Sequence, residues 1–298
     1  MTKSANWLLD HQASIYSQSG EDGIIDKILE TLPDTDRWCV EFGALEGKSL
    51  SNTRNLVEHA GYSAVLIEAN KARFKTLESN YAHVPNVTAL NRFVGFDASD
   101  NLDHILAETA IPTEFDFLSI DIDGNDYHVW KASTCYTPKV VCIEFNQTIP
   151  NEIAFVQAAD AAVTQGSSLS ALVELGKTKG YELVCVAGVN AFFVLSKYFP
   201  LFEIGDNSVT NLRVDLSAIT HFFIGYDGTI FLRGQKIMPW HCKLPIEESS
   251  IQRLPKFLRK FPESYNFPEL IAFGVYLLFS SPRILISEIS KRYTRMKS

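Results

Sequence analysis

Short apolar runs alternate with amphipathic stretches over the first 200 residues of the chain. The apolar runs predict strands at about 38–42, 63–68, 87–91, 115–120, 139–144, 181–187 and 191–196. Apolar positions at helical spacing predict a helix before the first strand, capped by Ser19, and further helices over 50–60, 71–80, 101–109 and 168–179. This alternation is typical of a doubly wound, mostly parallel sheet that binds ligands at the carboxyl ends of its strands. The tight link Gly188-Val189-Asn190 indicates that the last two strands form an antiparallel hairpin.

The pattern changes after about residue 200, so we divide the chain into a domain of residues 1–200 and a C-terminal extension of residues 201–298. Within the extension, the sequence around Tyr226-Asp227-Gly228 predicts two short strands. Residues 270–279 are continuously apolar, but spanning a bilayer takes about 20 such residues. This stretch is therefore either a helix buried against the domain or an interfacial anchor on an anionic membrane.

The distribution of charge favours the membrane anchor. Residues 250–298 hold nine Lys and Arg residues against three acids, whereas the whole chain has a net charge of −8. That overall acidity gives no sign of a nucleic-acid partner. The five cysteines show no metal-binding or disulfide spacing, and the N-terminus has no apolar signal core. We therefore expect a cytoplasmic protein, held at the inner face of the membrane if the basic tail anchors it.

A turn with two glycines follows the first predicted strand. Glu41 ends this strand, and Gly43 and Gly47 precede a polar helix start, but the spacing matches neither G-x-G-x-x-G nor a P-loop. An acid at this place repels phosphate and suits a cationic ligand end, such as the amino group of S-adenosylmethionine. Glu68 ends the second strand, where an acid accepts hydrogen bonds from a ribose. We expect Gln18 to lie near the same pocket; the alternative is an ordinary strand–turn–helix connection.

Acidic and amide side chains gather at the ends of the fourth and fifth predicted strands. They are Asp121, Asp123, Asp126 and His128 after the fourth strand, and Glu144 and Asn146 at the end of the fifth. Neighbouring strand ends lie about 4.8 Å apart, so these groups can converge on a hard divalent ion such as Mg²⁺. Asp121, Asp123, Glu144 and Asn146 are the expected ligands. Near them, Asp121, Asp126 and His128 are the expected catalytic residues, of which Asp126 or His128 would take a proton from the acceptor. The alternative is that Asp-Gly-Asn-Asp is ordinary turn chemistry.

Five motifs between residues 14 and 196 carry a resemblance to a known family. They are Tyr16-Ser-Gln-Ser-Gly-Glu-Asp-Gly, Val40-Glu-Phe-Gly-Ala-Leu-Glu-Gly, Leu66-Ile-Glu-Ala-Asn, Ser119-Ile-Asp-Ile-Asp-Gly-Asn-Asp-Tyr and Gly188-Val-Asn-Ala-Phe-Phe-Val. In these motifs the chain resembles FkbM-like S-adenosylmethionine-dependent methyltransferases. The resemblance implies a Rossmann-like α/β fold with a seven-stranded, mostly parallel sheet whose last strand is antiparallel. It also implies O-methylation, often of sugars or natural products.

The resemblance also implies roles for single residues. Glu41 and Gly43 would face the methionine part of the cofactor, Glu68 would take the ribose hydroxyls, and Asp97 would lie near the adenine. Asn70, the last residue of the third motif, would belong to the same cofactor site. Metal-dependent sugar O-methyltransferases look similar in placing acids at the ends of the fourth and fifth strands. Residues 200–298 carry no resemblance.

The leading hypothesis is therefore an S-adenosylmethionine-dependent O-methyltransferase that acts on a hydroxyl of a glycan or glycolipid. A metal-dependent glycosyltransferase that holds a nucleotide-sugar through Asp121-x-Asp123 is the alternative. A third hypothesis is a non-catalytic partner protein that keeps only the sheet. The sequence leaves the acceptor and the oligomeric state open.

Overall fold

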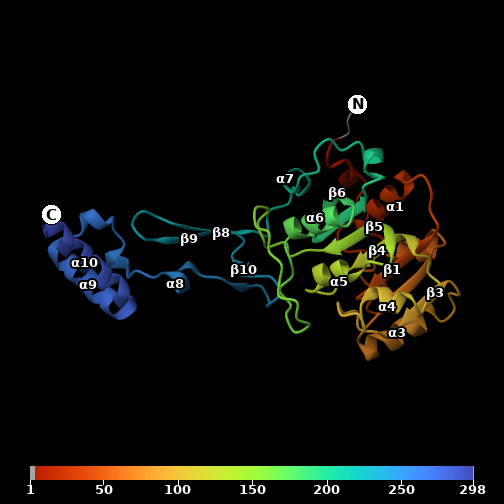
Figure 1. The fold of residues 1–298 in the computed structure, drawn as a ribbon, viewed down its shortest axis with the longest axis horizontal. Helices are drawn as coiled ribbons and strands as arrows, with labels where there is room; N and C mark the ends of the chain where they lie inside the picture. Colours follow the sequence, from red (N-terminus) through yellow and green to blue (C-terminus); the bar gives the residue numbers. More distant parts are fainter. Residues whose placement is uncertain (1–3, 298) are drawn as a thin grey trace. The chain divides into compact units, whose positions relative to one another are not determined.

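The computed structural model describes residues 4–297, with side chains described as far as Ser290 (Figure 1). The chain forms two compact units that divide between Leu216 and Ser217, and each is described by itself. Residues 201–216 belong to the first unit, where the indole N–H of Trp7 donates to the carbonyl of Phe202.

Seven strands form the central sheet of the first unit. They are β1 (Trp38–Phe42), β2 (Ser63–Ile67), β3 (Val87–Leu90), β4 (Glu114–Ile120), β5 (Thr137–Glu144), β6 (Tyr181–Ala187) and β7 (Asn190–Leu195). Their order is β3-β2-β1-β4-β5-β7-β6. Strands β1 to β5 pair in parallel, and β7 lies antiparallel between β5 and β6. The predicted Rossmann-like methyltransferase fold, with its antiparallel last strand, is confirmed.

Helices cover both faces of this sheet (Figure 1). Helix α1 (Glu21–Thr31) precedes β1. The connections between strands contain α2 (Arg54–His59), α3 (Lys71–Tyr81), α4 (Leu102–Leu106), α5 (Asp126–Ala132) and α6 (Leu169–Thr178). The short elements η1 (Trp7–His11), η2 (Phe199–Phe202) and α7 (Val209–Leu212) complete the unit.

Successive strand residues point to opposite faces, and the core accordingly divides into two clusters. One cluster joins Cys39 and Phe117 to residues of α1, α2 and α3. The other joins Val40 and Leu118 to residues of α4, α5 and α6. Because both faces are buried, the strands read as continuous apolar runs rather than as alternating ones.

Two helix starts differ from the prediction. The N-cap of α1 is Gly20, with φ 88°, and not Ser19. Helix α2 begins at Arg54 rather than near residue 50, because Leu50 has a left-handed backbone with φ 57° and the Ser51 hydroxyl accepts the N–H of Arg54. Helix α5 is an element that the sequence pattern did not predict.

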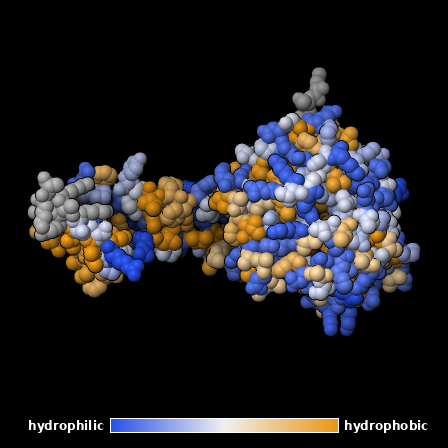
Figure 2. All heavy atoms as spheres, viewed as in Figure 1, coloured by the Kyte–Doolittle hydropathy of each residue, from blue (hydrophilic) through white to orange (hydrophobic). Residues whose placement is uncertain are grey.

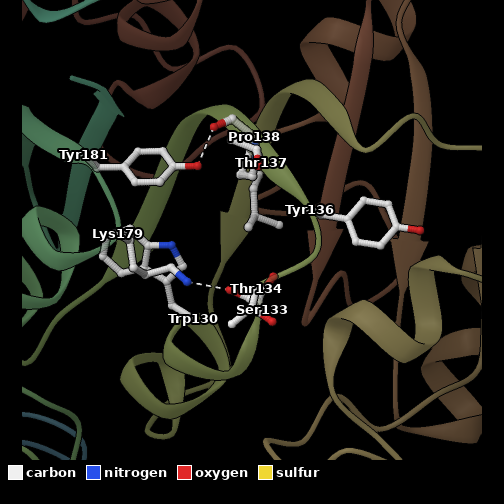
Figure 3. A pocket seen from close by; sticks show the side chains of 9 residues that line it. Trp130, Ser133, Thr134, Tyr136, Thr137, Pro138, Lys179 and Tyr181 are labelled. Atoms are coloured by element: carbon white, nitrogen blue, oxygen red, sulfur yellow. Dashed lines mark hydrogen bonds between the residues drawn. The ribbon is translucent and has the colours of Figure 1, made fainter. Parts of the chain in front are cut away.

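The amino-terminal edge of the sheet is closed by buried polar contacts. Lys139 at the start of β5 donates to the fully buried Asp116 of β4 at 2.9 Å. A cavity of about 270 Å³ also lies at this edge, between the first residues of β5 and β6 (Figure 3). Two of its polar side chains are paired: Lys179 donates to the carbonyl of Ser133, and Tyr181 donates to that of Pro138. These groups are therefore engaged in holding the fold together.

The second unit contains short strands and two longer helices. Its elements are β8 (Thr220–Ile224), β9 (Ile230–Gly234), β10 (Ile237–Met238), β11 (Leu244–Pro245), α8 (Glu248–Ile251), η3 (Lys256–Leu258), η4 (Pro262–Ser264), α9 (Phe267–Ser280) and α10 (Pro282–Lys297). Strands β8 and β9 pair in an antiparallel hairpin, which confirms the two strands predicted around Tyr226-Asp227-Gly228. Among the described residues, no helix combines the length and the apolar character needed to cross a bilayer.

Candidate functional site

The glycines of the turn after β1 allow close packing of the protein on itself. Gly43 has φ 73°, and a Cβ added there would lie 2.0 Å from the carbonyl oxygen of Asp121. Gly47 has φ 75°, and its Cβ would lie 2.5 Å from side-chain atoms of Leu77 and Tyr81 in α3. Gly43 therefore lets the carboxyl ends of β1 and β4 meet. Gly47 lets the turn pack closely against the Leu77 and Tyr81 side chains of α3.

Glu41 is buried and holds the loop that leads into α2. Its carboxylate accepts hydrogen bonds from the hydroxyl groups of Ser51 and Thr53, both at 2.6 Å. It also accepts the backbone N–H of Asn52 at 2.8 Å. Burial raises the pKa of Glu41, and these hydrogen bonds oppose that shift. Its described partners therefore give Glu41 the role of shaping the turn beside the site.

Glu68 lies directly after β2, on the opposite side of the turn from β4. Its buried carboxylate accepts the backbone N–H of Leu45 at 2.9 Å and that of Asn70 at 2.6 Å, through different oxygens. A carboxylate oxygen has two lone pairs, so each oxygen of Glu68 keeps capacity for a further donor. The Asn70 side chain caps α3 by accepting the N–H groups of Ala72 and Arg73. Asn70 therefore has a structural role in starting α3, and its cofactor role stays a prediction.

Two other predicted cofactor residues, Asp97 and Gln18, are exposed. The backbone N–H of Asp97 is held by Asp100 in the loop after β3. The carboxylate of Asp22 accepts the backbone N–H groups of residues 15, 16 and 17. These hydrogen bonds hold the backbone just before Gln18. This segment therefore has a defined course next to the N-terminus of α1.

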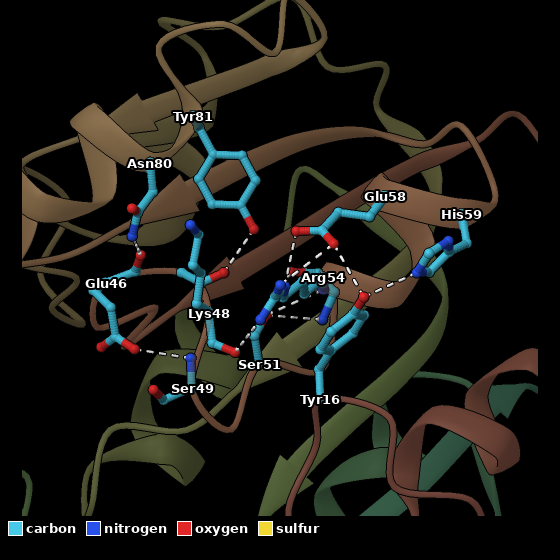
Figure 4. A network of polar contacts seen from close by, with 12 residues as sticks. Tyr16, Glu46, Lys48, Ser49, Ser51, Arg54, Glu58, His59, Asn80 and Tyr81 are labelled. Atoms are coloured by element: carbon cyan, nitrogen blue, oxygen red, sulfur yellow. Dashed lines mark hydrogen bonds and ion pairs between the residues drawn. The ribbon is translucent and has the colours of Figure 1, made fainter.

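A polar network joins this segment to α2 (Figure 4). The Tyr16 hydroxyl donates to Glu58 at 3.1 Å and lies 2.9 Å from Nε2 of His59. The Arg54 guanidinium lies over the Tyr16 ring, 3.8 Å from its centre, and pairs with Glu58. Arg54 also donates to the carbonyl of Lys48, in the glycine turn. Sequence analysis missed this network, which ties the glycine turn to the segment before α1.

Three carboxylates converge where β4 and β5 end. Asp121, Asp123 and Glu144 each offer one oxygen, and these oxygens lie within 4.8 Å of one another. Partial loss of hydration and the Asp123 carboxylate raise the pKa of Asp121. Burial and the negative charge of Asp121 raise the pKa of Glu144 to about 9 when no cation is bound. The predicted convergence of these three acids is present, and their oxygen chemistry suits a hard divalent ion.

The remaining residues predicted for this cluster have other partners. Asp126 is buried and accepts the backbone N–H groups of Ile122 and Gly124, both at 2.9 Å, which holds the turn after β4. Burial raises the pKa of Asp126 to about 7, but the group faces backbone donors rather than open space. The Asn146 oxygen accepts from Thr148, and its amide donates to Gln165. Asp126 therefore stabilises the turn after β4, and Asn146 joins the loops that carry Thr148 and Gln165; the catalytic role of Asp126 and the metal role of Asn146 stay predictions.

His128 lies in the first turn of α5. Its Nε2 is 2.8 Å from the carbonyl of Gln157, and a carbonyl only accepts. His128 is therefore protonated on Nε2, which leaves Nδ1 as its basic atom. Its ring packs beside Phe96 and Tyr127.

Sequence reasoning missed Glu21 and Asn190 as members of the site. Asn190 begins β7 opposite Glu144 and donates to the fully buried Glu21 at 3.0 Å. Asn190 is 4% exposed, and its Oδ1 has no hydrogen-bond partner within the part of the chain that the structure describes. Both residues stand in motifs that we used only for the family resemblance or the hairpin. Asn190 can reach Glu21 because the segment before α1 packs against the β6–β7 turn, where Gly188 lies close to Ser19.

No protein-family model matches this chain, and no curated protein matches it. Solved structures do resemble it. The N-terminal domain of EvdMO1, solved in the presence of SAH and D-fucose, matches with a TM-score of 0.40 and 12% identity over 58% of this chain and 80% of that one. The citrinin polyketide synthase CMeT domain matches with a TM-score of 0.42 and 11% identity, over 61% of this chain and 55% of that one. Precorrin-6y C5,15-methyltransferase from Geobacter metallireducens GS-15 matches with a TM-score of 0.36 and 16% identity, over 61% and 90%. At such scores these likenesses assign no activity to this chain.

The site can be summarised by its position and its charge. The chain order reverses between β1 and β4, so their carboxyl ends form the switch point at which doubly wound sheets bind ligands. Glu68 flanks this point on one side, and the carboxylates of Asp121, Asp123 and Glu144 flank it on the other. The groups that face the site are mostly hydrogen-bond acceptors, so a ligand with positive charge and hydroxyl donors fits them best.

Proposed function

We propose that this protein is an S-adenosylmethionine-dependent methyltransferase that methylates a hydroxyl group. The observation that carries the proposal is the acid-lined carboxyl edge of the sheet at the switch point between β1 and β4. Glu68 is the expected partner of the ribose hydroxyls, because each of its oxygens keeps a free lone pair beside the glycine turn.

The chemistry of the donor set supports this cofactor over a phosphate-bearing one. S-adenosylmethionine carries an ammonium and a sulfonium charge, and when bound it supplies an electrophilic methyl group. Asp121, Asp123 and Glu144 would attract such a cation and repel a nucleotide diphosphate. The Oδ1 of Asn190, which has no partner among the residues that the structure describes, is a further buried acceptor at the same edge, and it fits a hydroxyl donor.

Methylation of a hydroxyl releases a proton, and the carboxylates at the end of β4 are placed to receive it. In the metal-free site the raised pKa of Glu144 favours its protonated form, which leaves Asp121 as the proposed base. We further propose that Asp121, Asp123 and Glu144 hold a divalent cation of the Mg²⁺ type, which would displace the proton from Glu144 and whose charge would ease the crowding of three acids. Such an ion would supply Lewis acidity toward the acceptor oxygen.

The acceptor that we propose is a sugar hydroxyl of a glycan or glycolipid. This part of the proposal is supported by the resemblance of five motifs to FkbM-like enzymes. A polyhydroxylated acceptor also suits an edge that is rich in carboxylate and amide oxygens.

Calorimetry with S-adenosylhomocysteine (SAH) tests the cofactor assignment. We expect wild-type protein to bind SAH, and Glu68→Gln to weaken binding by about 10- to 100-fold, because a hydrogen bond to a charged group contributes about 1.5–3 kcal/mol. The matched control is Glu114→Gln, an exposed acid at the amino-terminal end of β4, which should bind SAH as wild type does.

Two results would contradict the assignment. Tight binding of uridine diphosphate with Mg²⁺ and no binding of SAH would identify a nucleotide-sugar site instead. Failure of the folded wild-type protein to bind either ligand would favour a non-catalytic protein.

A further inference from the structure

Helix α9 of the second unit exposes an apolar surface that the described residues of that unit leave uncovered. None of its 14 residues is buried. Phe279 is 83% exposed, Phe267 is 75% exposed and Ile271 is 54% exposed. Figure 2 shows hydrophobic side chains gathered over the α9–α10 hairpin.

The exposed apolar side chains of α9 occupy one continuous half of the helix. At 100° per residue, this half contains Phe267, Leu270, Ile271, Val275, Leu278 and Phe279. The polar residues Glu269, Tyr276 and Ser280 fall in a narrow strip on the opposite side. Glu269 is engaged there, since it forms a capping box with Asn266 and an ion pair with Lys260. An apolar surface this wide needs an apolar partner.

Helix α10 adds further exposed apolar side chains. It packs beside α9 after a break at Ser281 and Pro282, and it exposes Ile284, Ile286 and Ile289. The second unit offers little core to cover these residues. Among the described side chains of 217–290, only four hydrophobic ones are buried: Ile219, Ile230, Leu232 and Leu258.

The length of the helices restricts how they can meet a lipid bilayer. Fourteen residues at about 1.5 Å each make α9 about 21 Å long, which is less than the roughly 30 Å of hydrocarbon in a bilayer. The break at Ser281 and Pro282 prevents α9 and α10 from adding their lengths as one helix. A helical hairpin of this kind can lie in the interfacial layer of one leaflet.

The apolar surface of the hairpin could contact either a membrane or a second copy of the chain, and the surrounding charge favours the membrane. Arg253, Lys256 and Arg283 are exposed and flank the apolar surface in the sequence. From residue 250 to the end, the sequence has nine Lys and Arg residues against three acids. Two copies that met through this surface would bring like charges together, whereas anionic headgroups would complement them.

We infer that the α9–α10 hairpin docks into the surface of an anionic membrane. The apolar half of α9 lies among the acyl chains, and the basic residues that flank the hairpin contact the headgroups. This inference is independent of the proposed methyltransferase activity, because it concerns a different unit of the chain. The sequence led us to expect a membrane contact within residues 250–298, and the inference assigns that contact to the exposed apolar side chains of α9 and α10.

Sedimentation of the full-length protein with lipid vesicles tests the inference. We expect binding to vesicles of phosphatidylcholine with added phosphatidylglycerol, weaker binding to phosphatidylcholine alone, and release by salt. The double variant Ile271→Glu with Phe279→Glu should lower the partition coefficient at least tenfold, because two apolar side chains no longer insert. The control is Leu201→Glu, an exposed apolar residue of the first unit, which should bind as wild type does.

A second variant changes charge without changing the apolar surface. Arg253→Gln with Lys256→Gln should weaken binding to the anionic vesicles by about 30-fold and leave binding to neutral vesicles unchanged, since each basic residue near the surface contributes about 1 kcal/mol. Equal binding to both kinds of vesicle, or undiminished binding by the Ile271→Glu and Phe279→Glu variant, would overturn the inference. So would a wild-type dimer that fails to bind vesicles and that this variant dissociates in sedimentation velocity.

Discussion

Replacing Gly43 by Ala should damage the junction of β1 and β4 more than its small size suggests. Two costs add at this position. A left-handed backbone costs a non-glycine residue about 1–2 kcal/mol, and Gly43 has φ 73°. The new Cβ would also lie 2.0 Å from the carbonyl oxygen of Asp121, and a forced fit of one methyl group costs about 1–3 kcal/mol more. We therefore expect Gly43→Ala to lower the free energy of unfolding by about 2–5 kcal/mol.

Gly180→Ala is the matched control for the first of these costs. Gly180 has φ 81°, but a Cβ added there meets no atom within 4 Å. This variant should lose only about 1–2 kcal/mol, the cost of the left-handed backbone. The difference between the two variants thus isolates the contact between the glycine turn and the end of β4.

Urea unfolding, followed by circular dichroism, measures both losses, and calorimetry with SAH adds a functional readout. Gly43→Ala should weaken SAH binding because it displaces Asp121, whereas Gly180→Ala should bind normally. Equal losses of stability in the two variants, with unchanged SAH binding in both, would refute the reasoning about this turn.

Three further predictions concern charged groups. In metal-free buffer, the pKa of Glu144 is raised from 4.5 to about 9, so the folded state holds a proton that the unfolded state loses, and stability should fall as pH rises between these values. Glu144→Gln should therefore raise the melting temperature more at pH 8 than at pH 5, and an equal effect at both would contradict the raised pKa. Mn²⁺ binding, measured by electron paramagnetic resonance, should be lost in Asp123→Asn and kept in Glu114→Gln; persistence of binding in Asp123→Asn would remove the metal proposal. Lys139→Met should lower the free energy of unfolding by about 3–5 kcal/mol, because it leaves Asp116 buried without its cation; a loss below 1 kcal/mol in urea unfolding would show that backbone donors suffice.

The sheet could be predicted from the sequence because both of its faces are buried. Each strand therefore appears as a continuous apolar run, and Val40, Leu118 and Val141 carry that signal directly. The antiparallel hairpin followed from the short link at Gly188. The ends of the predicted strands also place Glu68, Asp121 and Glu144 on one edge of the sheet.

Other features depend on contacts between segments that are distant in the sequence. The hydrogen bonds by which Asp126 holds the turn after β4 and Asn70 caps α3 were not predicted from the sequence. The start of α2 was misplaced because the left-handed backbone of Leu50 has no sequence signature. Asn190 and Glu21 are 169 positions apart, and only the folded chain brings them together.

A crystal structure of the protein soaked with SAH would test the central claim most directly. We expect density for the ligand at the carboxyl ends of β1, β2 and β4, with the ribose hydroxyls within hydrogen-bond distance of the Glu68 carboxylate. Density at any other place, or a glycine turn that stays free of ligand at saturating SAH, would contradict the account.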